Sequence, residues 1–266
     1  STGQVIFEKN ADERRPVARV NKVMTILLTL EAVDEGRVSL EDQVTVSPRA
    51  ASMGGSQAFL DAGERYKLSE LLKTVIVASA NDSAVALAEH LAGTEESFVR
   101  LMNTRAEELG LTNTHYANCT GLPAQEHYTT ARDVAKLSAQ LDLHPIYYRY
   151  STIWMDEIKH RGGRVTSLTN TNRLIRFYPG CDGYKTGSTN EARYCVSATA
   201  KKEGMRLIAV VLGTPAGQTR FDEARAMLEY GFANVQLVTP IAQGQALDMT
   251  VPVRLGGRDE VSVLSG

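Results

Sequence analysis

Three short stretches of the sequence combine amine, hydroxyl and amide side chains that could act together in one polar site. The first is Lys185-Thr186-Gly187, within the segment 182–189. Lysine supplies positive charge, threonine donates a hydroxyl hydrogen, and glycine lets a bound backbone lie close to the chain. A tripeptide alone is weak support, because a strand edge with a turn glycine would look the same.

The second stretch is Ser79-Ala80-Asn81, between two helical segments. Serine and asparagine are both common at helix starts, so a helix cap is the ordinary explanation. The functional alternative is a loop that projects a hydroxyl and an amide into a cleft.

The third stretch centres on Lys22, which opens a strongly apolar run. Lysine is rarely buried without a partner. Burial would lower its pKa and allow it to act as a general base. The alternative is a helix-end lysine that keeps its ammonium group in water.

The amino-acid composition limits the classes of protein to which this chain could belong. The chain has 266 residues, and 29 Lys and Arg against 31 Asp and Glu give a net charge of −2, which argues against nucleic acid as a partner. A hydrophobic share of 43% is typical of a globular chain. No run of about 18 apolar residues exists, so no membrane span is expected. No leader precedes residues 4–7, but a leader removed before residue 1 would leave the same start.

Three cysteines, Cys119, Cys181 and Cys195, match no metal-binding spacing. They permit at most one internal disulfide, and small, partly buried thiols are the ordinary interpretation. No metal cluster, phosphate-binding loop or dinucleotide fingerprint is present, so no cofactor is implied.

Helices are expected where apolar residues recur at helical spacing and stop at glycine or proline. They are 22–33, 68–78, 83–91, 94–109, 130–141 and 220–232. Strands are expected at 4–7, 194–200 and 205–213, the last two joined by a turn at 201–204. This order predicts an α+β fold, an antiparallel sheet flanked by helices.

The amino-acid composition changes after Asn234. Valine-rich residues with glycine and proline breaks suggest strands of a second unit. About 30 residues are too few for a self-sufficient β-domain. The sequence therefore predicts one large domain, 1–234, followed by a partial or truncated β unit, 235–266.

Together the stretches resemble a known set of motifs, because Ser-x-x-Lys, Ser-x-Asn and Lys-Thr-Gly are typical of class A β-lactamases and penicillin-binding proteins. The chain most closely resembles the low-molecular-mass D-alanyl-D-alanine carboxypeptidases, and the resemblance covers most of residues 1–235. Further stretches that carry it, in the family's order, are 1–7, Pro16-Val-Ala18, Lys22-Val-Met-Thr25, Ala78-Ser-Ala-Asn-Asp82, Leu109-Gly-Leu-Thr-Asn-Thr-His115, Thr120-Gly-Leu122, Thr130-Ala-Arg-Asp133, Gly183-Tyr-Lys-Thr-Gly187 and 227–232.

One departure from the family pattern falls at the nucleophile. The family's serine lies three residues before the motif lysine, and here that position is Arg19. Arginine has no hydroxyl and stays protonated, so it cannot replace the serine. Three explanations compete: an engineered or recorded substitution in an otherwise active enzyme, a natural loss of catalysis, or a misaligned motif. The intact remaining motifs favour the first.

The resemblance implies an acyl-transfer site for a peptidoglycan stem peptide that ends in D-Ala-D-Ala. Lys22 would be the general base, and Ser79 would relay a proton to the leaving group. Asn81 would bind the substrate amide. The remaining implied ligand-binding residues are Lys185, Thr186 and Gly187 of the triplet, Ser188 in the oxyanion hole, and Arg220.

Two further side chains, Arg220 and Asp133, have ordinary interpretations. Arg220 could be a surface arginine at a helix end. Asp133 is interpreted as the acid of a capping box that begins at Thr130.

The resemblance also implies β-lactams as ligands and a site of action outside the cytoplasmic membrane, in the periplasm or on the outer membrane face. Family members often carry a C-terminal membrane-associating helix, so it further implies peripheral membrane association through a segment outside this sequence. For this chain, Arg19 predicts no turnover and no penicillin adduct. The alternative is a non-catalytic cell-wall peptide-binding protein of the same fold. A related β-lactamase is less favoured, because no counterpart of its deacylating carboxylate loop is evident.

Overall fold

The computed structural model of the chain describes residues 2–238, 246–252 and 260–264. The chain divides into two compact units, Ser1–Asn234 and Val235–Gly266.

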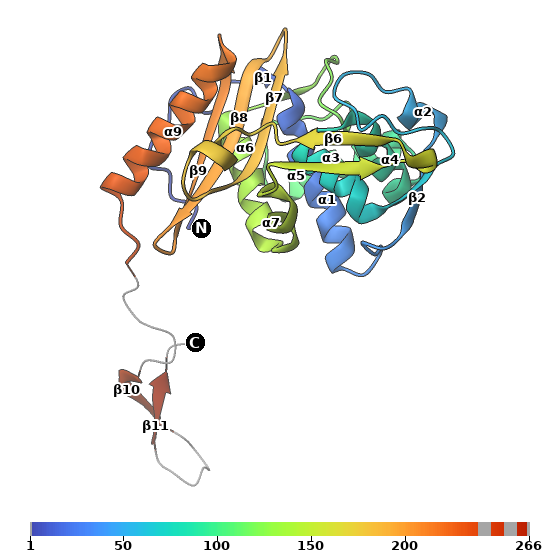
Figure 1. Ribbon diagram of the computed structural model, residues 1–266. Helices are drawn as coiled ribbons and strands as arrows, with labels where there is room; N and C mark the ends of the chain where they lie inside the picture. Colours follow the sequence, from blue (N-terminus) through green and yellow to red (C-terminus); the bar gives the residue numbers. More distant parts are fainter. Residues whose placement is uncertain (1, 239–245, 253–259, 265–266) are drawn as a thin grey trace. The chain divides into compact units, whose positions relative to one another are not determined.

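A three-stranded antiparallel sheet forms one half of the first unit (Figure 1). Its order is β7 (Cys181–Thr189), β8 (Arg193–Lys202) and β9 (Met205–Thr214), so β7 is an edge strand. Alternate residues of β8, such as Val196 and Ala198, pack against helix α9 (Gly217–Asn234). Between them, Ser197 faces the other way and lies 2.8 Å from Ser138 of α6 (Ala131–Gln140). The period of two therefore gives each face of the sheet its own helical layer.

The other half of the unit is helical and surrounds α1 (Lys22–Asp34). Met24, Ile26 and Leu27 on successive sides of α1 are fully buried, so the helix is covered on nearly every side. Its helical neighbours include α3 (Leu68–Val77), α4 (Asn81–Ala92), α5 (Glu95–Glu108) and α6.

Short strands and helices complete the first unit. Three antiparallel pairs, β1–β4, β2–β3 and β5–β6, lie outside the main sheet. The strands are β1 (Arg15–Pro16), β2 (Gln43–Thr45), β3 (Arg65–Lys67), β4 (Tyr128–Thr129), β5 (Met155–Lys159) and β6 (Val165–Thr169). The short helices are η1 (Arg19–Asn21), α2 (Pro48–Ala51), η2 (Leu141–Leu143), α7 (Ile146–Ser151), η3 (Arg161–Gly163) and α8 (Leu174–Phe177).

The predicted α+β class is confirmed, and each predicted helix has a counterpart within about two residues at most ends. The predicted strand at 4–7 is wrong, because these residues lie outside every helix and strand. Val5 and Phe7 are 55% and 59% exposed, and the segment pairs with no described strand. A short run of β-favouring residues forms a strand only when a neighbour pairs with its backbone.

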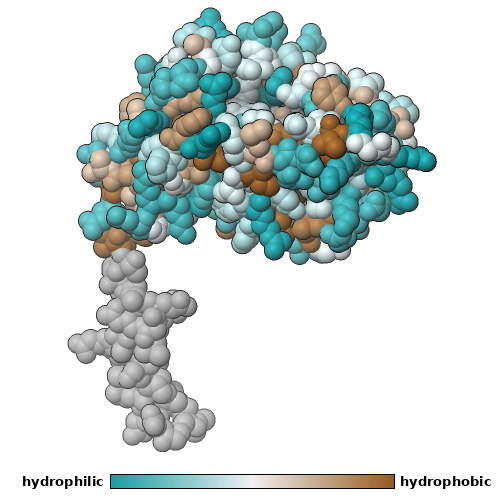
Figure 2. Space-filling model, viewed as in Figure 1, coloured by the Kyte–Doolittle hydropathy of each residue, from teal (hydrophilic) through white to brown (hydrophobic). Residues whose placement is uncertain are grey.

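On the face shown in Figure 2, hydrophobic side chains of the first unit are interspersed among hydrophilic ones. Cys119, Cys181 and Cys195 are buried free thiols. Every helix in the described part of the chain is too short or too polar to cross a bilayer.

The second unit contains an antiparallel pair of strands, β10 (Ala246–Pro252) and β11 (Glu260–Leu264). These two strands agree with the prediction of strands from the valine-rich sequence after Asn234. The rest of that segment, at 239–245 and 253–259, lies outside the described residues. That this unit begins a larger β-domain stays a prediction.

Candidate active site

Three elements from distant parts of the chain bring the predicted site residues together. Lys22 is the first residue of α1, and Asn81 is the first residue of α4. The Lys22 Nζ atom donates 2.6 Å hydrogen bonds to Oδ1 of Asn81 and to the carbonyl oxygen of Thr120. Lys185, in the middle of β7, lies close enough to act on Lys22 electrostatically.

Lys22 is fully buried, which decides between its two interpretations. The helix-end lysine with its ammonium in water is wrong. Burial holds its pKa well below the ordinary value, and the positive charges of Lys185 and Arg19 lower it further. A depressed pKa favours the neutral amine, which is the form that a general base requires.

The amide of Asn81 joins Lys22 to a loop at 54–60. Its Nδ2 donates to the carbonyl of Gly54 at 2.7 Å, while its backbone N–H donates to the carbonyl of Ser56 at 2.7 Å. Ala80 occupies the N-cap position of α4, and no side chain caps this helix. The helix-cap interpretation of Ser79 and Asn81 is therefore wrong.

Ser79 has a backbone conformation that residues other than glycine rarely adopt. Its φ is +61°, its side chain is 1% exposed, and its Oγ has no hydrogen-bond partner among the described residues. Strained backbone of this kind clusters at functional sites, because the surrounding structure must hold it in place. The free hydroxyl is available to a bound group or to a proton transfer.

Lys185 is 1% exposed, and its Nζ is also without a partner in the described part of the chain. Burial, with the positive charges of Arg19 and Arg220, lowers its pKa to about 7. Thr186 beside it is 4% exposed. An unpaired buried ammonium is costly, so this arrangement favours an anionic ligand that would pair with it.

Gly187 lets β7 touch η1. A Cβ atom at this position would lie 2.6 Å from the backbone nitrogen of Arg19 and 2.8 Å from that of Val20. Only glycine allows so close an approach. Ser188, the next residue, is half-buried at the same edge of the sheet.

Arg220 lies inside α9 and is half-buried, so the surface-arginine alternative is wrong. Its Nη1 donates to the carbonyl of Gly187 at 3.0 Å and to that of Cys195 at 3.3 Å. Burial lowers its pKa. Through these bonds it positions the backbone of β7.

Arg19 occupies η1, directly before α1. Its Nη1 donates a 2.7 Å hydrogen bond to Oγ of Ser56, and burial lowers its pKa. The guanidinium therefore reaches the loop that Asn81 holds, with Lys22 and Lys185 nearby. Three basic side chains therefore gather around one site.

The groups that hold these side chains in place were not predicted from the sequence. The Thr120 carbonyl and the loop at 54–60 carry no signal of their own, although Thr120-Gly-Leu122 is among the resembling stretches. Asp82, which accepts from the backbone N–H groups of Ala58 and Leu60 at 3.0 and 3.1 Å, also went unassigned.

Asp133 makes its contacts with residues outside the predicted site. The Thr130 Oγ1 caps α6 by accepting from the backbone N–H of Asp133, as predicted. The Asp133 carboxylate accepts from the Asn113 N–H at 3.0 Å and the Thr114 hydroxyl at 2.8 Å, so its predicted capping-box role is wrong.

Residues 1–216 match the family model described as D-alanyl-D-alanine carboxypeptidase. The chain belongs to this family. It is 44% identical over 235 residues to the D-alanyl-D-alanine carboxypeptidase DacF of Bacillus subtilis, and that match covers 88% of the chain and 60% of the relative. DacC of Escherichia coli, another D-alanyl-D-alanine carboxypeptidase, is 37% identical, with 100% of the chain and 67% of the relative covered. The chain thus spans about two thirds or less of these relatives.

Solved structures of the family agree with the fold. The D-alanyl-D-alanine carboxypeptidase DacD of Francisella tularensis superposes with a TM-score of 0.85 at 29% identity, over 99% of this chain and 76% of that one. Penicillin binding protein 5 of Haemophilus influenzae gives 0.86 at 30% identity, over 98% and 76%.

Proposed function

We propose that the chain carries the acyl-transfer site of a serine-type D-alanyl-D-alanine carboxypeptidase in which Arg19 stands at the nucleophile position. With Arg19 at this position, the chain binds substrate-like anions but forms no acyl-enzyme. The observation that carries the proposal is Lys22, which is buried, hydrogen-bonded to Asn81 and three residues beyond Arg19. A base is in place beside a residue that has no hydroxyl for it to deprotonate.

With serine at position 19, the remaining groups have definite tasks. The serine Oγ attacks the carbonyl of the penultimate D-Ala, and Lys22 accepts its proton. Ser79 passes a proton to the amine of the leaving D-Ala. Lys185 and Thr186 bind the terminal carboxylate. Water then attacks the acyl-enzyme and releases the shortened peptide.

Arg220 and Gly187 act on geometry in this proposal. Arg220 holds the carbonyl of Gly187, and Gly187 keeps β7 against the start of α1. Backbone N–H groups of β7 near Ser188 and of η1 then form the oxyanion hole for the developing negative charge. The Asn81 amide binds the substrate amide.

The chain as written cannot take the first step. A guanidinium stays protonated and is not a nucleophile in proteins. Its charge also lowers the pKa of Lys22 and of Lys185. The excess of positive charge still attracts an anionic peptide terminus, so non-covalent binding survives.

The test is intact-protein mass after incubation with a labelled penicillin. The parent chain should gain no mass, and Arg19→Ser should gain one penicillin per chain. Circular dichroism and a thermal melt establish that both proteins are folded. An adduct on the parent, or a folded Arg19→Ser protein without one, would contradict the proposal.

A second candidate is a non-catalytic protein that binds cell-wall peptides. The unpartnered Lys185 Nζ and Ser79 Oγ favour it, since both would find partners in a bound peptide. Calorimetry separates the two: this candidate requires the parent to bind an acetylated D-Ala-D-Ala peptide more tightly than Arg19→Ser does. Both candidate functions involve peptidoglycan and therefore a location outside the cytoplasmic membrane. The first candidate also implies β-lactams as ligands and peripheral membrane association.

A further inference from the structure

Glu95 is a buried carboxylate outside the three motif stretches. It is the first residue of α5, directly after the N-cap residue Thr94. A glutamate in the first turn of a helix interacts favourably with the helix dipole and is ordinarily exposed to water. Glu95 is only 4% exposed, and a buried carboxylate needs partners that offset the loss of water. Those partners show what Glu95 holds.

One oxygen of Glu95 binds the segment 118–122. Its Oε1 accepts from the backbone N–H and from the thiol of Cys119, both at 3.3 Å. Burial and the charge of Glu95 raise the pKa of this thiol, so it stays protonated and can donate. Glu95 therefore fixes both the backbone and the side chain of a residue 24 positions away.

The other oxygen of Glu95 is held by Arg49. Oε2 accepts from Nε of Arg49 at 3.0 Å and also from its Nη2. Two charge-assisted bonds from one guanidinium orient the carboxylate and leave Oε1 for Cys119. The Arg49 side chain is 56% exposed, so this end of the arrangement reaches water.

Two successive carbonyl groups of the segment bind helix α1. The Cys119 carbonyl accepts from Oγ1 of Thr25 at 2.8 Å. The next carbonyl, that of Thr120, accepts from Nζ of Lys22 at 2.6 Å. Glu95 thus binds the residue directly before the one whose carbonyl meets the proposed base.

The same segment contacts η1 at position 19. Gly121 has a φ of +79°, and a Cβ atom there would lie 3.0 Å from Cα of Arg19 and closer still to the carbonyl oxygen of Ala18. Nδ2 of Asn21 donates to the carbonyl of Asn118 at 2.9 Å. One short segment therefore touches both the nucleophile position and the lysine three residues later.

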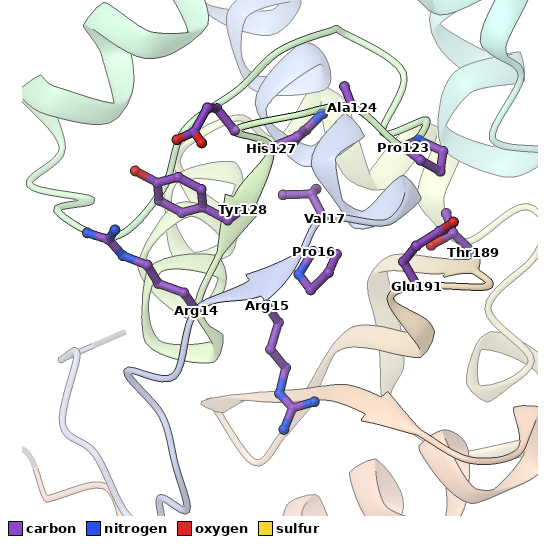
Figure 3. Close-up of a pocket in the computed structure, with 11 residues that line it drawn as sticks. Arg14, Arg15, Pro16, Val17, Pro123, Ala124, His127, Tyr128, Thr189 and Glu191 are labelled. Carbon is purple, nitrogen blue, oxygen red and sulfur yellow. The ribbon is translucent and has the colours of Figure 1, made fainter.

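The chain that follows this segment borders a cavity. Pro123, Ala124 and Val17 are among the residues that line this space of about 330 Å³ (Figure 3). A cavity supplies no packing contacts, so the placement of the segment depends more on its hydrogen bonds. Those to Glu95 have a charged acceptor, and such bonds are roughly twice as strong as neutral ones.

We propose that Glu95 is a positioning residue for Lys22: it holds Cys119, and through Cys119 it keeps the Thr120 carbonyl on the lysine amine. The inference rests on the proposed function, because it takes Lys22 as the general base. Without this carbonyl, the amine loses a partner that orients it. The ammonium form also loses an acceptor that stabilises it, so the pKa of Lys22 falls further.

Glu95→Ala in the Arg19→Ser background removes the contacts to Cys119. We expect the plateau rate of penicillin acylation at high pH to fall by at least about tenfold, because the base is misplaced. The midpoint of the pH–rate profile should move to lower pH by about half to one unit, the equivalent of one hydrogen bond. Acylation rates from pH 5 to 10 measure both.

Glu96→Ala is the matched control, because Glu96 lies in the same turn of α5 and is exposed. It should leave the rate and the midpoint unchanged. Glu95→Gln keeps an acceptor oxygen for Cys119, so it should keep the midpoint of Arg19→Ser. An unshifted midpoint in Glu95→Ala, or a loss of equal size in Glu96→Ala, would overturn the positioning role.

Arg49→Met tests the same path without removing the buried acid. The change is made at an exposed side chain, so this protein should fold even where Glu95→Ala does not. It should lower the rate by about two- to threefold, as for loss of a partly exposed ion pair, and move the midpoint in the same direction. Circular dichroism establishes which variants are folded. If Glu95→Ala does not fold, an Arg49→Met profile identical to that of Arg19→Ser would refute the proposal.

Failure of this role and failure of the proposed function have different readouts. If Arg19→Ser forms no penicillin adduct, the proposed function fails, but the effect of Glu95 on Lys22 can still be measured in the parent chain. NMR titration of lysines labelled with carbon-13 at Cε gives the pKa of Lys22, with Lys22→Met to assign the signal. That pKa should be lower in Glu95→Ala than in the parent and unchanged in Glu96→Ala. An unchanged pKa in Glu95→Ala would rule out the positioning role even where acylation succeeds.

Discussion

The Nζ atom of Lys22 and Oδ1 of Asn81 are joined by a 2.6 Å hydrogen bond, although 59 positions separate the two residues. The second acceptor for Lys22 is the neutral carbonyl of Thr120. Neither direct partner carries a negative charge, so burial dominates and the pKa of Lys22 falls. The site therefore depends on the neutrality of residue 81 as much as on its shape.

Asn81→Asp in the Arg19→Ser background tests this dependence. A carboxylate beside the amine stabilises the ammonium and raises the pKa of Lys22. We expect acylation by penicillin at pH 7 to fall by about 10²-fold or more, the lower range for loss of a general base. The rate should recover as pH rises toward 10, so rates from pH 6 to 10 are the measurement. Asn234→Asp, on the exposed end of α9, is the control. An unchanged pH profile would show that Lys22 is not the base.

Anion binding by the parent chain should depend on the protonation of Lys185. Its pKa is about 7 because of burial and the charges of Arg19 and Arg220. The ligand carboxylate stays ionised throughout, so affinity is constant below pH 7 and falls by up to about tenfold per pH unit above it. Calorimetry with an acetylated D-Ala-D-Ala peptide from pH 6 to 8.5 measures this. Lys185→Met should bind weakly with no such slope, and a flat profile for the parent would refute the role.

The same pKa makes a prediction about stability. Lysine in the unfolded chain titrates near 10.4, so between pH 7 and about 10 the unfolded state binds more protons at this position. The contribution of Lys185 to the free energy of unfolding therefore rises with pH across this window. Urea unfolding at pH 7 and 8.5 should show a larger gain for the parent than for Lys185→Met. A gain of equal size in both proteins would mean that Lys185 titrates normally.

The sequence alone predicted some of the elements that carry the site and not others. The apolar run after Lys22 predicted the buried helix, since a helix without a polar face has to be central. Strand β7 was predicted only as the ordinary alternative for Lys185-Thr186-Gly187, because this segment lacks an apolar alternation. Pairing with β8, as between Lys185 and Ser197, is what makes this segment a strand. Tertiary contacts overrode local pattern there.

The groups that hold the site were harder to predict for a different reason. The Thr120 and Gly54 carbonyls belong to the backbone, and every residue carries one. Only the folded chain decides which carbonyl meets the ammonium of Lys22 or the amide of Asn81. A motif can therefore name the reacting side chains and still leave out what orients them.

Asp82 should prove structural to the loop at 54–60. Its carboxylate is 1% exposed and accepts from the backbone N–H groups of Ala58 and Leu60. Asp82→Asn turns an amide donor toward these donors, so we expect the free energy of unfolding to fall by about 2–3 kcal/mol. Urea unfolding measures it. Asp61→Asn, which loses an exposed pair with Arg164, should cost at most about 1 kcal/mol. Equal losses in the two variants would count against the anchoring role.

The close contact between Gly187 and η1 gives the last prediction. In Gly187→Ala the new methyl group would lie 2.6 Å from the backbone nitrogen of Arg19 and 2.8 Å from that of Val20, so β7 and η1 must move apart. In the Arg19→Ser background this shifts the nucleophile away from the oxyanion donors. Misplacement of about 1 Å costs on the order of 10²-fold in rate. Gly54→Ala is the matched control, because a methyl group there meets nothing within 4 Å. Penicillin acylation rates of the two variants, measured on folded protein, should differ by at least tenfold; equal rates would mean that the approach of β7 to η1 does not position the reacting groups.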